Sequence, residues 1–302
     1  MKSIALLPTV TIEVWVLMLK KIGIYAKKSH PEVEQIAMFV AQKFTTAGID
    51  VLIEDGLAEQ IGQVNGYAGE EIPSQVDMIV VLGGDGTLIS VARQVGEREV
   101  PIVGVNLGQL GFLTEITHEE LPEMLDRLIA GDYKVSERMM IDAFIHREDK
   151  VIGKYTVLND AVINKGALAR IIDMETYVDG RHLSTYKADG LIISTPTGST
   201  GYSLAAGGPI IYPEINSLLI TPICPHMLTN RPIIVWSRSV IEIEVKFQDD
   251  VVFFTADGQV GHKLLRGDRV ELRRSETRTR LVSSPSREYF QILRTKLSWG
   301  ER

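Results

Sequence analysis

The sequence predicts an α/β N-terminal domain with a parallel, doubly wound-like sheet, followed by an all-β antiparallel C-terminal domain. The chain has 302 residues, 45% of them hydrophobic, which is enough for two cores. Strand-like apolar runs alternate with helix-period segments as far as residue 134, and such alternation builds parallel sheets. Beyond residue 135, apolar and charged residues alternate, as in strands with one face in water.

In the first domain, apolar spacing separates strands from helices. We expect strands at 21–25, 49–53, 78–82 and 101–105, and helices at 31–48, 87–95 and 118–129. In the first helix, Val33, Ile36, Val40 and Phe44 recur at helical spacing before Gly48 ends it. These elements predict a sheet covered on both faces.

In the second domain, turn residues and period-two patterns predict hairpins. Residues 176–183 form an expected hairpin around Asp179-Gly180, residues 241–247 an expected strand, and 266–268 an expected turn. Residues 289–297 suggest either a closing helix or a strand that returns to the first domain. We expect the domains at 18–134 and 135–275, with 276–302 packing back on the N-terminal domain.

The N-terminus carries an apolar run, SIALLPTVTIEVWVLML at 3–19. Pro8 and Glu13 interrupt it, and no small-residue cleavage site follows, which disfavours a membrane span or a signal peptide. Met18 resembles an ordinary start before the first strand. We therefore expect residues 1–17 to be a dispensable extension, and a form that begins at Met18 to remain active.

Composition excludes several classes of protein. The net charge of −7 argues against a nucleic-acid partner. No basic amphipathic helix is evident, so no membrane partner is expected. A single cysteine, Cys224, excludes an internal disulfide and suits the cytoplasm. The six histidines are dispersed, which disfavours a structural zinc site.

The segment VVLGGDGTLIS at 80–90 predicts a phosphate site. A strand that runs through glycines into a helix presents free backbone N–H groups, and Gly83, Gly84 and Gly86 allow close approach, with Thr87 beside them. It is neither a Walker A loop nor a dinucleotide fingerprint. A carboxylate here suits phosphoryl transfer, because Asp85 would face the acceptor hydroxyl while a cation offsets the charge. A plain turn capped by Asp is the alternative.

A second small-residue segment, 189–209, follows the apolar run 191–193. Its hydroxyl-rich turn suits a long ligand lying against backbone, and Ser199 or Thr200 would cap a following helix. A bulge followed by a capped helix is the structural alternative.

Six segments together resemble the bacterial NAD kinase family, in order from about Lys20 to Trp299. They are GGDGT at 83–87, GVNLGQLGFLT at 104–114, LND at 158–160, STPTGST at 194–200, PHMLTNRP at 225–232 and DGQ at 257–259. The first is shared with lipid kinases and phosphofructokinases, so the ordered set carries the resemblance.

The resemblance implies transfer of a phosphate to the 2′-hydroxyl of the adenosine ribose of NAD, giving NADP, with ATP as donor and other phosphoryl donors left open. It implies Asp85 as proton acceptor, Mg²⁺ carried by the ATP phosphates rather than by a protein cage, and a homodimer or homotetramer. NAD-binding residues implied by it are Asp85, Gly86, Asn159, Asp160, Arg170, Lys187, Asp189, Thr200, Gly201, Tyr202, Ser203, Leu204, Ala205 and Gln259.

Two other functions compete. A diacylglycerol-type lipid kinase would share only the GGDGT loop, and a non-enzymatic dinucleotide sensor would make Asp85 incidental. Simple structural roles also remain open: Arg170 and Lys187 as solvated charges, and Asn159-Asp160 as a turn. Neither the choice between ATP and polyphosphate nor that between NAD and NADH can be read from the sequence.

Overall fold

Four parallel strands begin the fold. The computed structural model describes residues 19–27, 31–63, 65–166, 171–227, 229–247 and 251–299, so residues 1–17 lie outside the described chain. The first elements are β1 (Lys21–Ala26), α1 (Val33–Thr46), β2 (Asp50–Ile53), α2 (Asp55–Gln60), η1 (Ile72–Ser74), β3 (Met78–Leu82), α3 (Asp85–Val95), η2 (Gly96–Arg98), β4 (Ile102–Asn106), β5 (Ile116–Thr117) and α4 (Leu121–Ala130).

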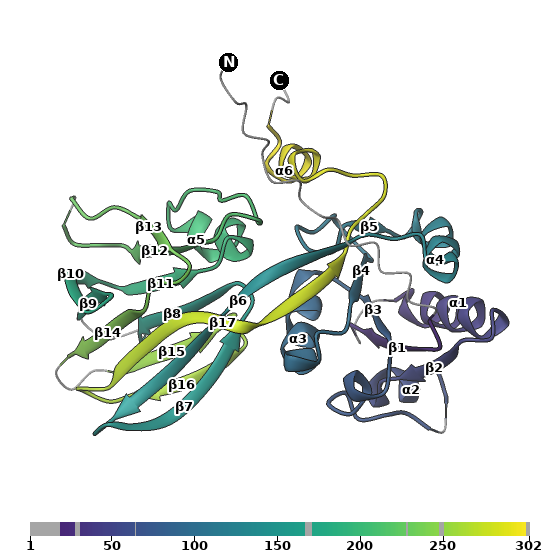
Figure 1. The fold of residues 1–302 in the computed structure, drawn as a ribbon, viewed down its shortest axis with the longest axis horizontal. Coiled ribbons are helices and arrows are strands. Elements are labelled where there is room, and N and C mark those ends of the chain that lie inside the picture. The colour runs from purple at the N-terminus through teal and green to yellow at the C-terminus, as the bar shows by residue number, and fades with distance from the viewer. Residues whose placement is uncertain are drawn as a thin grey trace, which may run out of the picture.

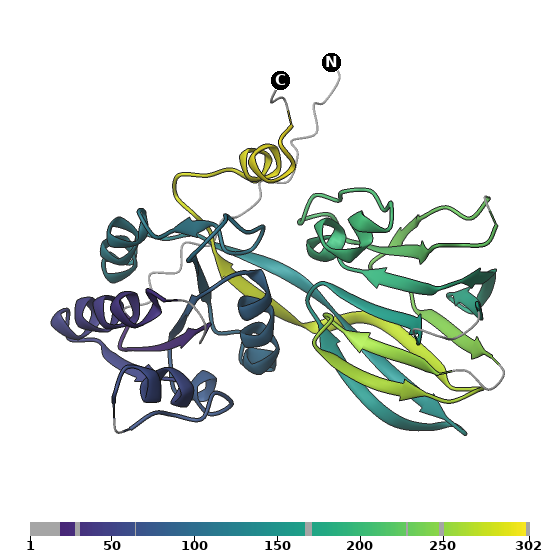
Figure 2. The same ribbon diagram turned by 180° about the vertical axis from the view of Figure 1, so that it is seen from behind.

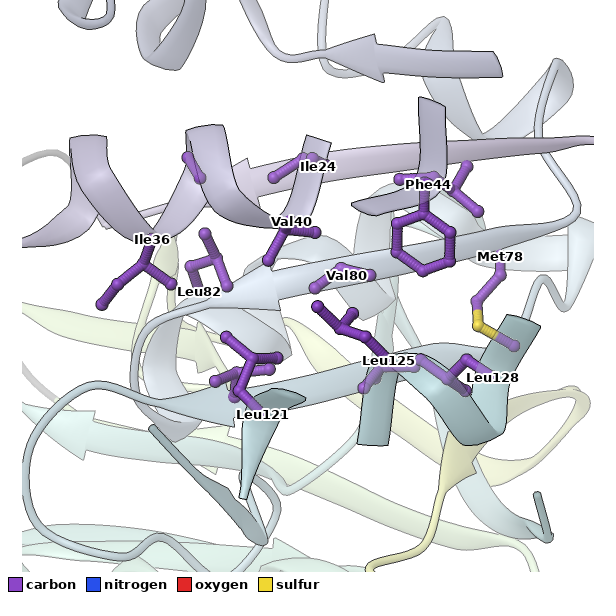
Figure 3. Packing of buried hydrophobic residues seen from close by; sticks show 14 of the residues in the cluster. Ile24, Ile36, Val40, Phe44, Met78, Val80, Leu82, Leu121, Leu125 and Leu128 are labelled. Carbon is purple, nitrogen blue, oxygen red and sulfur yellow. The ribbon is translucent and has the colours of Figure 1, made fainter. Parts of the chain in front are cut away.

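The parallel strands lie in the order β2-β1-β3-β4 and carry helices on both faces. On one face α1 and α4 pack together: Phe44 and Leu125 meet Val80 in one buried cluster (Figure 3). On the other face α3 buries Leu88 and Val91 against β3. Because β3 and β4 are covered on both sides, every one of their residues is buried.

Two antiparallel sheets form the second half. Its elements are β6 (Val135–Arg147), β7 (Lys150–Val157), β8 (Asp160–Lys165), β9 (Ile172–Val178), β10 (Arg181–Ala188), β11 (Gly190–Ser194), η3 (Thr197–Thr200), α5 (Tyr202–Ala205), β12 (Ser217–Ile223), β13 (Ile233–Trp236), β14 (Ile241–Lys246), β15 (Val252–Ala256), β16 (Val260–Leu264), β17 (Arg269–Val282) and α6 (Tyr289–Leu297). One sheet has the order β13-β12-β11-β8-β15-β16. Its inner side chains, such as Phe254, pack with Tyr186 and Ile243 of the other sheet.

The long strand β17 connects the two halves. It runs antiparallel to β6 and β14, and near its end Leu281 pairs in parallel with Ile102 of β4. The eleven-stranded sheet therefore continues from the parallel part into the antiparallel part, with α3 lying between them (Figures 1 and 2). After β17 the chain returns to the first half, where the Ser284 N–H donates to the Glu115 carboxylate at 3.0 Å.

The fold class is confirmed, with local differences. The Asp179-Gly180 turn is present, with φ of 51° and 72°. The expected cap at Ser199 or Thr200 is wrong, because Gly201 precedes α5 and the Ser199 hydroxyl donates to the Pro196 carbonyl at 2.6 Å. The helix expected at 118–129 begins later, at Leu121, where Pro122 occupies the first turn.

Candidate functional site

The glycine turn after β3 forms the first part of the site. A Cβ at Gly83 would lie 2.8 Å from Oγ1 of Thr87, so this turn packs too closely for a side chain there. At Gly84 and Gly86 a Cβ would meet nothing within 4 Å. The four predicted phosphate-binding residues thus surround the N-terminus of α3, where free N–H groups and the helix dipole favour an anion.

The carboxylate of Asp85 is fixed by the segment 112–114. Its Oδ1 accepts bonds from Leu113 N at 3.1 Å, Thr114 N at 3.0 Å and Thr114 Oγ1 at 3.0 Å, and its Oδ2 accepts one from Phe112 N at 2.8 Å. Asn106 Nδ2 in turn donates to Thr114 Oγ1 at 2.8 Å. With one protein donor, Oδ2 keeps a lone pair for a further partner.

Sequence reasoning assigned no individual role to the segment 104–114. The structure gives it one: it orients Asp85. Gly111 is necessary for this, because a Cβ there would stand 2.1 Å from Oδ1 of Asp85. The pattern of glycines and Thr114 was visible in the sequence, but its partner carboxylate, which lies 29 residues away from Thr114, was not.

Asn159 and Asp160 form the second part of the site, where the chain passes from β7 into the first residue of β8. They line a cavity of about 330 Å³ together with Tyr202. The Asn159 Oδ1 atom is buried and has no hydrogen-bond partner among the described residues. Because buried polar atoms are normally paired, this oxygen is available to a ligand.

Asp257, absent from the predicted NAD-binding set, holds this pair in place. Its carboxylate accepts bonds from the backbone N–H groups of Leu158 at 3.0 Å, Asn159 at 2.7 Å and Asp160 at 3.1 Å. It begins a turn with φ of 50°, followed by Gly258 with φ of 65°. The Asp-Gly pair in the sequence predicted the turn. It did not indicate that the Asp257 carboxylate accepts hydrogen bonds from residues far away in the chain.

Burial makes Asp160 unusual. Its side chain is almost entirely buried, which, together with repulsion from the Asp257 carboxylate, raises the pKa of Asp160 to about 7. Burial also raises the pKa of Asp257, although its three backbone N–H bonds and the charge of Arg93 lower it. Two adjacent buried carboxyl groups thus compete to remain protonated.

The residues from Thr200 to Ala205 differ in where they lie relative to the Asn159-Asp160 cavity. A Cβ at Gly201 would lie 3.6 Å from Asn159 Nδ2 and 3.9 Å from Asp160 Oδ2, and Tyr202 lines the cavity. Ser203 instead faces Thr221, with its hydroxyl 2.9 Å away and buried. Thr200 precedes Gly201 at the end of η3, whereas Leu204 and Ala205 complete α5.

Gln259 joins the two parts of the site. Its Nε2 donates to the Gly86 carbonyl at 2.7 Å, and its Oε1 accepts a bond from Arg93 Nη2 at 2.8 Å. The turn that carries Asp257 is therefore tied to the first turn of α3, which carries Asp85. Gln259 thus links the glycine turn at 83–87 to the turn that supports the Asn159-Asp160 cavity.

Two predicted residues are not brought to this cavity. Asp189 lies 3.4 Å from Lys165 and Lys187 lies 3.6 Å from Asp173. Because Ser194 pairs with Asp160 and Gly190 with Asn164, Asp189 lies about 16 Å along the strands from Asp160. Arg170 lies outside the described residues.

Within the described ranges no group of three or more His, Cys, Asp or Glu side chains could hold a metal ion. Over the same part of the chain, no helix is both long and apolar enough to cross a membrane.

Comparisons with known proteins agree over both halves. The family model of the ATP-NAD kinase N-terminal domain matches residues 22–133, and that of the C-terminal domain matches residues 158–284. The NAD kinase of Geotalea daltonii is 57% identical over 284 residues, covering 94% of this chain and 100% of that protein. That of Syntrophotalea carbinolica is 55% identical over 285 residues, with the same coverage.

A solved structure shares the fold. The crystal structure of yeast NADH kinase complexed with NADH matches with a TM-score of 0.88 at 25% identity, covering 95% of this chain and 90% of that one.

Proposed function

This chain belongs to the NAD kinase family, and from that premise we propose that its catalytic centre lies between Asp85 and the Asn159-Asp160 pair. As a member, it is a kinase that phosphorylates NAD to NADP, with ATP as donor. The observation that carries the proposal is the Oδ1 atom of Asn159, which is buried and has no partner in the described part of the chain. It lies in a cavity that Gln259 ties to the helix bearing Asp85.

In this proposal, Asn159 and Asp160 bind the adenosine ribose, and Asp85 acts on its 2′-hydroxyl. Oδ2 of Asp85 accepts the hydroxyl proton as the 2′-oxygen bonds to the terminal phosphorus of ATP. The bond from that phosphorus to the bridging oxygen breaks, and ADP leaves. Because other bonds hold Oδ1 still, little reorganisation is needed.

The donor phosphates occupy the N-terminus of α3. Gly84 and Gly86 provide N–H groups and open space for them, and Thr87 its hydroxyl. Gly83 contributes through the close turn that it forms, because its own N–H donates to the Val105 carbonyl at 2.9 Å. Mg²⁺ would enter this site bound to the phosphates of ATP, since it is commonly held by substrate phosphates and one or two carboxylates. Asp85 is the carboxylate of this turn. When bound, the cation neutralises charge on the transferred phosphoryl group.

The remaining predicted residues would contact the rest of the dinucleotide. We assign Thr200 to Ala205 and Gln259 to the walls of the NAD site, with Gly201 and Tyr202 nearest the ribose. Lys187 and Asp189, at the other end of β8 and β11, and Arg170 would serve a more distant part of NAD.

We also propose that the chain forms a homodimer or homotetramer in the cytoplasm. The edge strand β13 supports the assembly, because Ile234 and Trp236 expose 53% and 69% of their surface. The lone exposed thiol of Cys224 suits a reducing compartment. Light scattering of the purified protein measures the assembly, and a monomer would contradict it.

The catalytic assignment is tested with labelled ATP, Mg²⁺ and either NAD or diacylglycerol. We expect label in NADP and none in lipid. Asp85→Asn should still bind NAD but lose kcat by about a thousandfold or more, because proton acceptance and orientation are both damaged. Unchanged turnover in that variant would overturn the role of Asp85.

A further inference from the structure

Arg93 lies on α3 two turns after Gly86. The two residues are seven positions apart, so they share one face of the helix, about 10 Å apart along its axis. Helical side chains point back toward the N-terminus, and in this direction Arg93 Nη2 donates to Gln259 Oε1 at 2.8 Å. The other end of that amide, Nε2, donates to the Gly86 carbonyl at 2.7 Å. The Gln259 amide is therefore bonded to α3 through both its oxygen and its nitrogen.

These two bonds determine which way the Gln259 amide faces. An amide can turn either its oxygen or its nitrogen toward a neighbour, because one end accepts hydrogen bonds and the other donates them. A guanidinium carries donors only, so Arg93 bonds the oxygen, and the nitrogen then faces the Gly86 carbonyl. In the reversed orientation, two oxygens would face each other at Gly86 and an N–H group would face the cation. Arg93 thus selects the orientation that ties Gln259 to the first turn of the helix.

A cavity beside Arg93 does not account for this arginine. It has a volume of about 490 Å³ and lies between the end of α3 and strands β6, β7 and β17. Its other charged lining residues are one lysine and three acids, Lys154, Glu97, Asp142 and Glu276. This balance disfavours an anion, which is the ligand that a guanidinium binds best. Arg93 Nη1 is buried and finds no hydrogen-bond partner in the described part of the chain. Because such a group costs stability, its presence favours a role in function.

The turn that contains Gln259 also supports Asn159 and Asp160. Asp257 accepts bonds from the N–H groups of Asn159 at 2.7 Å and Asp160 at 3.1 Å, and its own N–H donates to the Asp160 carbonyl at 2.9 Å. Burial raises the pKa of Asp257, whereas its backbone N–H bonds and the charge of Arg93 lower it. Arg93 therefore acts on this turn twice, by a hydrogen bond to Gln259 and by its charge on Asp257.

We propose that Arg93 is a positioning residue, which holds the turn between β15 and β16 on α3 and thereby aligns the bound ribose with Asp85. The inference rests on the proposed function, because it concerns how the acceptor hydroxyl meets that carboxylate. Since α3 carries both Asp85 and Arg93, the two parts of the site share one rigid element. A looser turn leaves the ribose bound but moves its 2′-hydroxyl relative to Asp85 Oδ2. Arg93 accordingly affects kcat more than the binding of NAD.

Arg93→Met and Arg93→Lys test this role. The two new side chains have similar lengths, and only lysine keeps a charged donor for Gln259. We expect Arg93→Met to lower kcat about tenfold, the change that follows from losing one hydrogen bond to a charged group. The Kd for NAD should stay within about threefold, and Arg93→Lys should recover kcat to within about threefold of the wild type. The matched control Arg98→Met removes an exposed arginine just beyond α3 and should leave both quantities unaltered.

A double-mutant cycle shows whether Arg93 acts through Gln259. Gln259→Met removes the amide and approximately keeps the side-chain volume. In that background we expect Arg93→Met to change kcat by less than about twofold, because the hydrogen bond that it breaks is already absent. A further loss of about tenfold in the double variant would show that Arg93 acts through another group, which overturns the proposal.

The remaining outcomes separate this inference from the catalytic assignment. Melting temperatures first confirm that each variant folds, and Arg93→Ala, which has the best helix-forming side chain, replaces Arg93→Met if that variant does not fold. A wild-type kcat in the folded variant, a Kd for NAD that rises as much as kcat falls, or no recovery in Arg93→Lys overturns the role of Arg93 alone. Failure of the wild-type enzyme to make NADP from NAD, ATP and Mg²⁺ would instead overturn the proposed function.

Discussion

Gly111 lies directly against the carboxylate of Asp85. A Cβ at this position would stand 2.1 Å from Oδ1 of Asp85 and 2.3 Å from Oγ1 of Thr114, so Gly111→Ala must displace the carboxylate. A shift of about 1 Å in a reacting group costs about a hundredfold, and we expect kcat to fall by that order. The Kd for NAD should change less than about threefold, which is no more than the free-energy contribution of one hydrogen bond, because the substitution does not contact Asn159 or Asp160. Steady-state kinetics and calorimetry measure the two quantities.

Gly108→Ala is the matched control for this change. It lies in the same segment, and its Cβ would meet only Oδ1 of Asn106, at 3.9 Å. We expect kcat to stay near the wild-type value. Equal losses in both variants would show that the segment as a whole, rather than the contact with Asp85, sets the rate.

Asp160 makes the stability of the fold depend on pH. Because its pKa is raised from 3.8 to about 7, the folded protein holds a proton between these values that the unfolded chain has released. This stabilisation is complete below about pH 4 and is lost as the pH rises through about 7. Asp160→Asn cannot ionise, and it also relieves the repulsion on Asp257.

The measurement is urea unfolding of both proteins at pH 5 and pH 8. We expect the free energy of unfolding of Asp160→Asn, relative to the wild type, to improve by about 2 kcal/mol between the two pH values. Parallel pH profiles would mean that the carboxyl group of Asp160 is already ionised at pH 5.

At the scale of elements, the sequence predicted those strands and turns that depend only on residues close together in the chain. The strand at 78–82 and the hairpin at Asp179-Gly180 follow from apolar runs and a two-residue turn, and both are present. The boundary at Ser199 was wrong because its hydroxyl bonds back to Pro196 instead of to the next helix. Asp85 was identifiable for the same reason, since the glycine turn and helix start are contiguous in the sequence.

Long-range pairing could not be predicted in this way. The fourteen residues of β17 bond to β6, β14 and β4, which lie far away in the sequence. The support of Asn159-Asp160 by Asp257 likewise joins residues nearly a hundred positions apart. Such contacts depend on the assembled tertiary structure and leave no periodic trace in the sequence.

The turn between β15 and β16 therefore supports Asn159 and Asp160 through the one carboxylate of Asp257. Asp257→Asn offers a single acceptor oxygen to three backbone N–H groups and turns an amide N–H toward donors. We expect the free energy of unfolding to fall by about 2–3 kcal/mol and the Kd for NAD to rise, as measured by urea unfolding and calorimetry. Asp149→Asn, exposed and also at positive φ, is the control and should be neutral. Equal effects in the two variants would contradict the prediction.

At the scale of the whole molecule, the end of the chain braces the segment that holds Asp85. Arg287 donates to the Glu115 carbonyl at 2.7 Å and pairs with the Glu120 carboxylate. Lys296 of α6 lies over the ring of Phe112, 5.7 Å from its centre. Because residues 112–114 bond the Asp85 carboxylate directly, the C-terminal segment stands one contact away from that carboxylate.

Arg287→Met tests this connection, since it keeps the aliphatic bulk and removes both polar contacts. We expect the free energy of unfolding to fall by about 1–3 kcal/mol and kcat to fall about fivefold through a looser segment at 112–115. The KM for NAD should stay at the wild-type value, because the substitution does not contact the Asn159-Asp160 cavity. Arg294→Met, on the exposed face of α6, provides the control for charge removal. A loss of stability with an unaltered kcat would confine Arg287 to folding and separate the C-terminal segment from catalysis.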